Sequence, residues 1–257
     1  DNVSNEDHNN IDNKIDFDDN KLHADIDLEV IKLEQVFKEN IGDKLKNKKI
    51  LITAGPTFEK IDDVRFIGNF SSGKMGYAIA EQAALAGAEV TLISGPVSLK
   101  TPKDVHRIDI QSAKEMYDNA IKEFESSDIA ILAAAVADYK PTKQKNGKLK
   151  KDEIGKELTI DLKATDDILH QLGLNKKPGQ QLIGFALESS NAIGNGWKKL
   201  KSKNCNMVVV NSVNKPDSGF GGDKNTISIL LRDGNQFNYE AMSKTKCAQE
   251  ILLKMED

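Results

Sequence analysis

The sequence predicts an α/β fold, a three-layer αβα domain with a mostly parallel, Rossmann-like sheet and an antiparallel hairpin at its edge. From Lys48 onward, short apolar runs that end at glycine, proline or polar residues alternate with helix-like stretches. Such alternation is typical of parallel strands joined by crossover helices. Near the end of the chain, two β-rich runs flank Arg232-Asp-Gly-Asn235, a turn sequence that favours a hairpin.

The predicted elements follow in chain order. The strands 49–53 and 89–94 are apolar runs that end just before Gly55-Pro56 and Gly95-Pro96, and these residue pairs stop a strand. The other predicted strands are 128–136, 181–185 and 206–210, and the hairpin strands are 226–231 and 236–239. Apolar residues at helical spacing predict helices over 72–86, 112–126, 166–173, 190–203 and 242–255.

The first part of the chain has a different composition. Residues 1–20 contain seven acidic residues and one lysine, whereas the net charge of the whole chain is −4, so the rest is mildly basic. This stretch has too little apolar surface to offset the entropy of ordering it, and residues 24–42 read as a lone amphipathic helix. We therefore expect a disordered acidic tail plus a short helix over 1–47 and the folded domain over 48–257. The chain opens at Asp1 rather than at methionine, which is compatible with a piece of a longer protein.

Composition excludes several classes of protein. The 257 residues, 39% apolar and 30% charged, are enough to bury a core. No apolar run approaches the roughly 18 residues of a membrane helix, and no signal-peptide pattern opens the chain. Cys205 and Cys247 have no close cysteine or histidine neighbours, which argues against a zinc site or a disulfide framework. These features indicate a soluble, cytoplasmic protein.

The most informative motif is Val64-Arg-Phe-Ile-Gly-Asn-Phe-Ser-Ser-Gly-Lys-Met-Gly76, which leads directly into a predicted helix. Unpaired backbone N–H groups and the helix dipole favour an anion at such a helix start. Ligands of doubly wound sheets bind beyond the carboxyl ends of the strands, where Gly55, the loop 134–138, residues 185–188 and Asn211 also fall. The sequence thus predicts a phosphate or carboxylate site in one crevice.

Two better-known motifs fit poorly. Gly68-x-x-x-x-Gly73-Lys74 resembles a P-loop, but Met75 stands where a hydroxyl residue would hold magnesium, and the first strand ends well before the motif begins. Tyr139-x-x-x-Lys143 imitates the catalytic pair of short-chain dehydrogenases, but it lies in a loop, and no Gly-x-Gly-x-x-Gly follows the first strand. Both interpretations are disfavoured.

The loop from Lys140 to Glu153 contains six lysines and follows Asp138 closely. Such a run is most often a solvated surface, and a nucleic-acid patch is a further alternative. As a flap over the crevice, it would neutralise the charge of a nucleoside triphosphate. The residues alone leave these interpretations open.

Seven blocks along residues 48–255 form a recognisable series. They are Gly55-Pro-Thr57 with Glu59, Asp62 to Gly76, Ser94-Gly-Pro96, Ala134-Ala-Val-Ala-Asp138, Lys148-x-Lys-Lys151, Gly184-Phe-Ala-x-Glu188 and Gly219-Phe-x-x-Asp223-x-Asn225. In their order and spacing, these blocks resemble bacterial phosphopantothenoylcysteine synthetase, the phosphopantothenate–cysteine ligase that is usually the C-terminal half of a bifunctional protein. Seven separate matches make chance an unsatisfactory explanation.

The resemblance implies a two-step ligation in coenzyme A biosynthesis. The carboxylate of 4′-phosphopantothenate attacks the α-phosphate of CTP, which gives an acyl-cytidylate and pyrophosphate. The amine of cysteine then displaces CMP and forms an amide. The resemblance also implies Mg²⁺, a preference for CTP over ATP, and a homodimer, with no nucleic-acid or membrane partner.

It further implies roles for individual residues. Lys148 binds and activates the triphosphate, Asn69 holds the acyl carbonyl of the intermediate, and Arg65 supports the same carboxylate or the pantothenate end. Asp138 contacts the ribose or magnesium. Structural readings remain open: Arg65 as an ion pair, Phe185 as core, and Lys199 and Lys203 as solvent-facing. The implied nucleotide-binding residues are Gly55, Ser71, Ser72, Gly73, Ala134, Asp138, Lys148, Phe185, Lys199 and Lys203.

The chain departs from the family pattern in places. Phe58, Lys60 and Asp63 replace a basic residue and two prolines, which puts substrate affinity at the loop 56–68 in doubt. Residues 1–47 show nothing of the flavin-dependent decarboxylase half, so we expect no flavin. Two alternatives from other classes stay open: a non-catalytic nucleotide-binding module, and an NAD(P)-binding oxidoreductase of Rossmann type.

Overall fold

The computed structural model describes residues 32, 34–188, 190–212 and 222–256, which belong to two compact units, 1–39 and 40–257. In the first unit, residues 34–39 are helical, within the range predicted for the amphipathic helix. The predicted disordered stretch lies outside the described residues. All elements below belong to the second unit.

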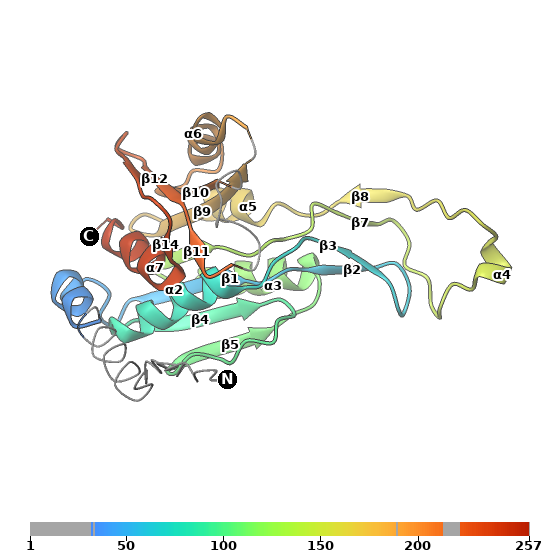
Figure 1. Ribbon diagram of the computed structural model, residues 1–257, viewed down its shortest axis with the longest axis horizontal. Coiled ribbons are helices and arrows are strands. Elements are labelled where there is room, and N and C mark those ends of the chain that lie inside the picture. The colour runs from blue at the N-terminus through green and yellow to red at the C-terminus, as the bar shows by residue number, and fades with distance from the viewer. Residues whose placement is uncertain (1–31, 33, 189, 213–221, 257) are drawn as a thin grey trace, which may run out of the picture. The chain divides into compact units, whose positions relative to one another are not determined.

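An eight-stranded sheet forms the centre of this unit, as Figure 1 shows. Its pairings are parallel except where β12 pairs with β10 and with β13. This confirms the mostly parallel sheet and its antiparallel edge hairpin. In spatial order the strands are β13 (Gln236–Asn238), β12 (Ile227–Leu231), β10 (Met207–Ser212), β9 (Gln181–Glu188), β6 (Ile129–Leu132), β1 (Lys49–Ala54), β4 (Glu89–Ser94) and β5 (Val105–Asp109).

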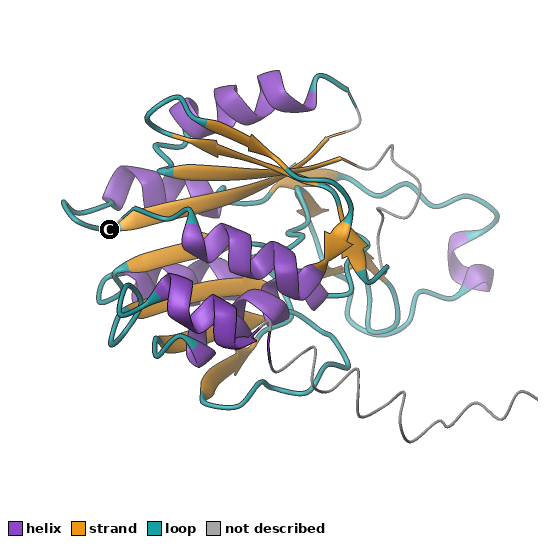
Figure 2. Ribbon diagram, turned by 60° about the vertical axis from the view of Figure 1, so that its left-hand side comes forward, coloured by secondary structure: helices purple, strands orange, loops and turns teal. Residues whose placement is uncertain are grey.

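Helices cover both faces of the sheet (Figure 2), which confirms the three-layer αβα architecture. On one face, Met116 of α3, Leu172 of α5 and Leu200 of α6 join a core cluster with Leu51 of β1. On the other, α2 and α7 pack against each other, and α2 packs on β1 and β4. Side chains alternate along a strand, so each central strand supplies apolar groups to both faces. The helices are α2 (Lys74–Leu85), α3 (Ala113–Phe124), α5 (Ile168–Asn175), α6 (Ala192–Ser202) and α7 (Lys244–Leu253).

Several elements were not predicted from the sequence. The edge strand β5 contains two apolar residues, Val105 and Ile108, separated by His106 and Arg107, so it forms no apolar run. The three two-stranded pairs are too short to show a period. One of these pairs begins a long arm that carries the short helix α4 (Figure 1). The additional elements are β2 (Phe58–Lys60) with β3 (Phe66–Gly68), β7 (Tyr139–Pro141) with β8 (Leu162–Ala164), β11 (Lys224–Asn225) with β14 (Met242–Ser243), and α4 (Lys151–Ile154).

The predicted boundaries of three strands differ from the structure by more than one residue: β9 continues to Glu188 rather than 185, β10 is Met207–Ser212 rather than 206–210, and β6 differs most. The apolar run 128–136 was expected to be a single strand, but β6 ends at Leu132. Beyond it the chain turns toward the end of β1, where Ala133 N donates to Thr53 O at 3.2 Å and Ala135 N donates to Gly55 O at 2.9 Å. The alanine-rich segment therefore forms a loop at the sheet edge rather than more strand.

Both cysteines are free and fully buried, Cys205 in the core beside α6 and Cys247 within α7. Burial raises the pKa of each thiol to about 11. Among the described helices, none is both long and apolar enough to cross a membrane.

Helix α2 approaches β1 very closely at Gly76. A Cβ at this position would lie 2.6 Å from the Cβ of Ala54 and 3.1 Å from the carbonyl oxygen of Thr53. Because the contacts come from a buried strand, they cannot move away as a flexible side chain would. Glycine here fixes how near the start of α2 lies to the sheet.

We expect Gly76→Ala to lower the free energy of unfolding by about 1–3 kcal/mol, the usual cost of overpacking. Alanine ordinarily stabilises a helix relative to glycine by up to about 1 kcal/mol, so the sign of the change is diagnostic. Urea denaturation measures it, with the exposed Glu81→Ala on the same helix as control. A Gly76→Ala protein as stable as the wild type would contradict the close approach.

Candidate functional site

Two adjoining cavities open at the carboxyl ends of β1, β6 and β9. The large cavity has a volume of about 880 Å³ and the small cavity about 180 Å³. Phe70, Ala134, Ala135, Phe185 and Leu187 line both, so the two cavities form one continuous site. The crevice predicted from the strand ends is therefore present.

The loop that separates the cavities from the sheet is held by three side chains. Thr53 Oγ1 accepts from Ala134 N at 3.3 Å, and the fully buried Thr57 Oγ1 accepts from Ala137 N at 2.9 Å. From the other side, Asn69 Nδ2 donates to the carbonyl oxygen of Val136 at 2.9 Å. These bonds fix the backbone of the loop. A binding surface needs such a fixed backbone if it is to be complementary to a ligand in shape.

One lysine of α6 and the lysine that caps its C-terminus form the cationic wall of the large cavity. Lys199 and Lys203 lie one helical turn apart, and both line the cavity. Lys199 Nζ donates to Phe185 O at 2.5 Å, and Lys203 Nζ pairs with Asp167 Oδ2 at 2.7 Å. Burial raises the pKa of Asp167, but the bonds from Lys203 and from the His170 amide outweigh it and lower that pKa. These ammonium groups can attract an anionic ligand.

The start of α2 forms one wall of the small cavity. Ser71, Ser72 and Gly73 line it, and the first turn of the helix carries no acidic side chain. Gly73 adopts φ 74°, and a Cβ there would lie 3.5 Å from the backbone of Gly55. Gly55 itself is not among the described residues that line either cavity, and a Cβ on it would lie 3.1 Å from the carbonyl oxygen of Gly95. The arrangement can bind a phosphate or carboxylate group.

The small cavity also contains an unsatisfied acceptor. Asn211 Oδ1, at the end of β10, is buried and has no hydrogen-bond partner among the described residues. Nearby, Lys244 Nζ donates to Asn225 Oδ1 at 3.0 Å, and burial lowers the pKa of Lys244. A buried oxygen without a donor costs about 1–3 kcal/mol, so a ligand N–H or O–H would be favoured here.

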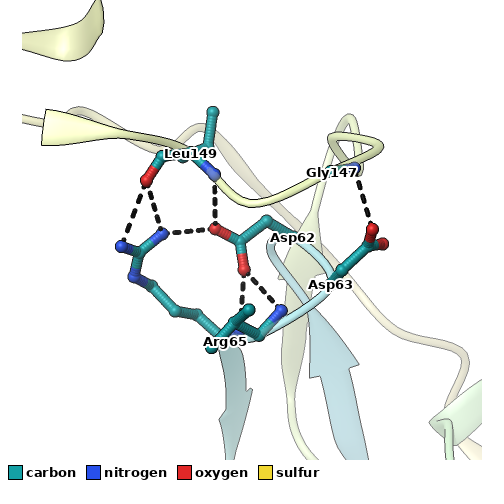
Figure 3. A network of polar contacts seen from close by, with 6 residues as sticks. Asp62, Asp63, Arg65, Gly147 and Leu149 are labelled. Atoms are coloured by element: carbon teal, nitrogen blue, oxygen red, sulfur yellow. Dashed lines mark hydrogen bonds and ion pairs between the residues drawn. The ribbon is translucent and has the colours of Figure 1, made fainter. Parts of the chain in front are cut away.

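Arg65 and Lys148 line neither cavity within the described structure. Arg65 forms an ion pair with the buried Asp62, and both its Nη1 and Nη2 donate to Leu149 O, at 3.3 and 3.2 Å. The same Asp62 accepts from Leu149 N at 3.1 Å, and Asp63 accepts from Gly147 N at 2.9 Å (Figure 3). Lys148 therefore lies between two residues held by the turn of the β2–β3 hairpin.

The structure thus divides the predicted site residues into groups. Asn69, Ala134, Asp138, Phe185, Lys199 and Lys203 line the large cavity, and Ser71, Ser72, Gly73, Ala134 and Phe185 line the small one. Sequence reasoning missed residues 165–168 at the start of α5 and the highly exposed Phe70, which also line the large cavity. The signal was Asp167, an N-cap residue just before an apolar run, since it accepts from His170 N at 2.8 Å.

Three acidic residues lie at the large cavity. Asp138, Asp166 and Asp167 line the large cavity, but across the described ranges no three His, Cys, Asp or Glu side chains come together as a metal site. Mg²⁺ is commonly held by one or two carboxylates together with substrate phosphates and water. The carboxylates present fit that use.

Comparisons with known proteins show which sequences and structures this chain is similar to. The family model for the DNA/pantothenate metabolism flavoprotein C-terminal domain matches residues 45–257. The coenzyme A biosynthesis bifunctional protein CoaBC of Bacillus subtilis (strain 168) is 45% identical over 225 residues, which are 87% of this chain and 55% of that protein. A cysteine/cysteine sulfinic acid decarboxylase from an unknown prokaryotic organism is 45% identical over 220 residues, or 85% of this chain and 61% of that protein.

A solved structure extends the comparison. The crystal structure of the C-terminal domain of a CoaBC protein matches with a TM-score of 0.69 and 42% identity, and the match covers 82% of this chain and 95% of that one. The chain spans little more than half the length of the two curated relatives described above.

The environment of Asp62 makes stability depend on pH. Burial raises its pKa, but the amides of Val64, Arg65 and Leu149 and the Arg65 guanidinium outweigh that effect and lower it from 3.8 to about 2. The ionised carboxylate therefore stabilises the fold above the unfolded-state pKa, and this contribution is lost as the pH falls through the folded-state pKa.

We expect the wild type to exceed Asp62→Asn in free energy of unfolding by a constant amount above about pH 5, and this difference to shrink as the pH falls toward about 2. Urea titrations at several pH values measure it, and Asp152→Asn, an exposed aspartate on the arm, is the control. A difference that stays the same down to the lowest pH would contradict an ionised, hydrogen-bonded Asp62.

Proposed function

The chain belongs to the DNA/pantothenate metabolism flavoprotein C-terminal domain family, and we propose that it joins 4′-phosphopantothenate to cysteine in coenzyme A biosynthesis. The observation that carries this proposal is the continuous site, in which a cationic wall and a helix start that can bind an anion meet at Ala134 and Phe185. Support also comes from the 42% identity to the C-terminal domain of a CoaBC protein.

The proposed reaction has two steps. The carboxylate of 4′-phosphopantothenate attacks the α-phosphate of a nucleoside triphosphate, and pyrophosphate leaves. The amine of cysteine then attacks the acyl carbon, and the nucleoside monophosphate leaves as the amide forms. Because a carboxylate approaches a polyanion in the first step, charge neutralisation and alignment matter more than a general base.

The described residues can meet these needs. The large cavity has room for the nucleoside, with Lys199 and Lys203 beside the phosphates, and the start of α2 can donate N–H groups at the reacting phosphate. An amide NH₂ group carries two protons, and Asn69 uses one on Val136, so the other can hold the acyl carbonyl. Asp138 is exposed and lines the large cavity, where it can serve the ribose or a magnesium ion.

The proposal includes CTP as the preferred nucleotide, Mg²⁺ as its companion, and a homodimer as the working form. We propose no flavin chemistry for this chain. A nucleotide-binding module without catalysis and an NAD(P)-binding oxidoreductase are the alternatives that the assays below separate.

We expect pyrophosphate release that requires both 4′-phosphopantothenate and CTP with magnesium. Removing one preorganised donor to developing charge costs about 100- to 1,000-fold, so Lys199→Ala and Lys203→Ala should reduce kcat/KM by up to that range. The control is Lys198→Ala on the same helix, which is exposed and outside both cavities. Nucleotide binding without pyrophosphate release would favour the non-catalytic module, and saturable NAD(P)H binding that competes with CTP would favour the oxidoreductase.

Asn211 offers a separate test of the small cavity. We expect Asn211→Leu to raise the KM for 4′-phosphopantothenate by a factor corresponding to about 1–3 kcal/mol, because a substrate donor loses its acceptor. The KM for CTP should change less, since the nucleoside is assigned to the large cavity, which Asn211 does not line, and the substrate that reacts with CTP is assigned to the small one. Equal changes in both KM values would contradict this assignment, and circular dichroism checks that the variant folds.

A further inference from the structure

The lysine-rich arm is joined to the β2–β3 hairpin at alternate residues. Lys145 N donates to Ile61 O at 2.9 Å, Gly147 N to Asp63 Oδ2 at 2.9 Å, and Leu149 N to Asp62 Oδ2 at 3.1 Å. Alternate spacing is that of one edge of an extended strand. The residues on both sides of Lys148, Gly147 and Leu149, are therefore bonded through their N–H groups to one turn of the hairpin (Figure 3).

The turn itself is held by the same carboxylate. Asp62 Oδ1 accepts from Val64 N at 2.8 Å and from Arg65 N at 2.7 Å, while Oδ2 accepts from Leu149 N and from the Arg65 guanidinium. The Asp62 side chain is completely buried, and that of Arg65 is 38% exposed. The Asp62 carboxylate thus binds the N–H of Leu149 while the Arg65 guanidinium binds its C=O. This geometry specifies one register of the arm relative to the hairpin.

We propose that Asp62, Asp63 and Arg65 form a latch that positions Lys148 for the reaction. The kinetic part of this inference rests on the proposed ligase function. In this role Arg65 is a positioning residue: it holds the carbonyl of Leu149, and it affects the chemistry through Lys148 rather than by touching the substrate.

The hairpin is suited to this role because its other end belongs to the site. Strand β3 leads through Gly68 into Asn69, and both line the large cavity. At the start of β2, the buried Thr57 holds the loop 134–138 through Ala137 N. A short two-stranded element thus connects the residues that surround the ligand to the segment that carries Lys148.

The first test measures anchoring without any assay of activity. Trypsin is added to the full chain, and cleavage after Lys145, Lys148 and Lys150 is followed by mass spectrometry for the wild type, Asp62→Asn and Asp152→Asn. We expect Asp62→Asn to be cut in the arm about ten-fold faster, since proteolysis follows the population of the open form, while Asp152→Asn behaves as the wild type. Equal arm cleavage in all three proteins would overturn the latch.

A second variant separates the latch from general destabilisation. Arg65→Lys keeps the positive charge but not the fork that reaches Leu149 O. We expect faster arm cleavage with an unchanged melting temperature and unchanged cleavage elsewhere. Arm cleavage at the wild-type rate in Arg65→Lys would remove the arginine from the latch.

The kinetic test is a double-mutant cycle on pyrophosphate release. We expect Asp62→Asn to lower kcat/KM about 10- to 100-fold when Lys148 is present, the size of effect that a small misplacement of a catalytic group produces, and to add little when Lys148→Ala is already in place. An equal reduction in both backgrounds would mean that Asp62 acts independently of Lys148 and would overturn the inference. If the wild type releases no pyrophosphate, the proposed function fails, while the proteolysis result still decides whether the latch exists.

Discussion

The site depends on a short set of hydrogen bonds at the end of β1. Beyond the last residue of β6, Pro56 and Ala135 pair in a parallel bridge, and the buried Thr57 hydroxyl accepts from Ala137 N. Each buried N–H left without a partner would cost about 1–3 kcal/mol, so the loop has little freedom to move elsewhere. Both cavities share this loop as a common wall. The wall forms because the regular pairing of β1 with β6 stops at Leu132 and one further bridge, between Pro56 and Ala135, follows it.

The β2–β3 hairpin is fixed in turn, and it connects this loop to the arm. Two short strands are marginal by themselves, and here a ring stack within the hairpin and a hydrogen bond to the start of α3 support them. Phe58 and Phe66 stack with ring centroids 3.9 Å apart, and the buried Glu59 accepts from Ala113 N at the start of α3. The hairpin therefore holds Asn69 at one end and the arm at the other in fixed positions relative to the core.

The sequence predicted what local patterns can encode. Strands such as β1 and β4 are buried, so they appear in the sequence as apolar runs followed by glycine. Their ends converge at one edge of the sheet, and this predicted one crevice. The edge strand β5 and the short pairs have no such apolar run. The place of Arg65 beside Leu149 could not be read from the chain because the partners are 84 residues apart, and no local pattern records a pairing over that distance. At the start of α5, the N-cap Asp167 marks the helix locally, but only the fold shows that these residues reach the cavity.

The two buried thiols give the domain a pair of built-in chemical reporters. Cys205 lies in the core beside α6, whereas Cys247 belongs to α7 on the opposite face of the sheet. With pKa values near 11, both stay protonated and inert to alkylating reagents while the layers remain closed. Alkylation of Cys205 therefore reports opening of one face, and alkylation of Cys247 reports opening of the other. The ratio of the two alkylation rates tells whether the helix layers separate from the sheet together or one after the other.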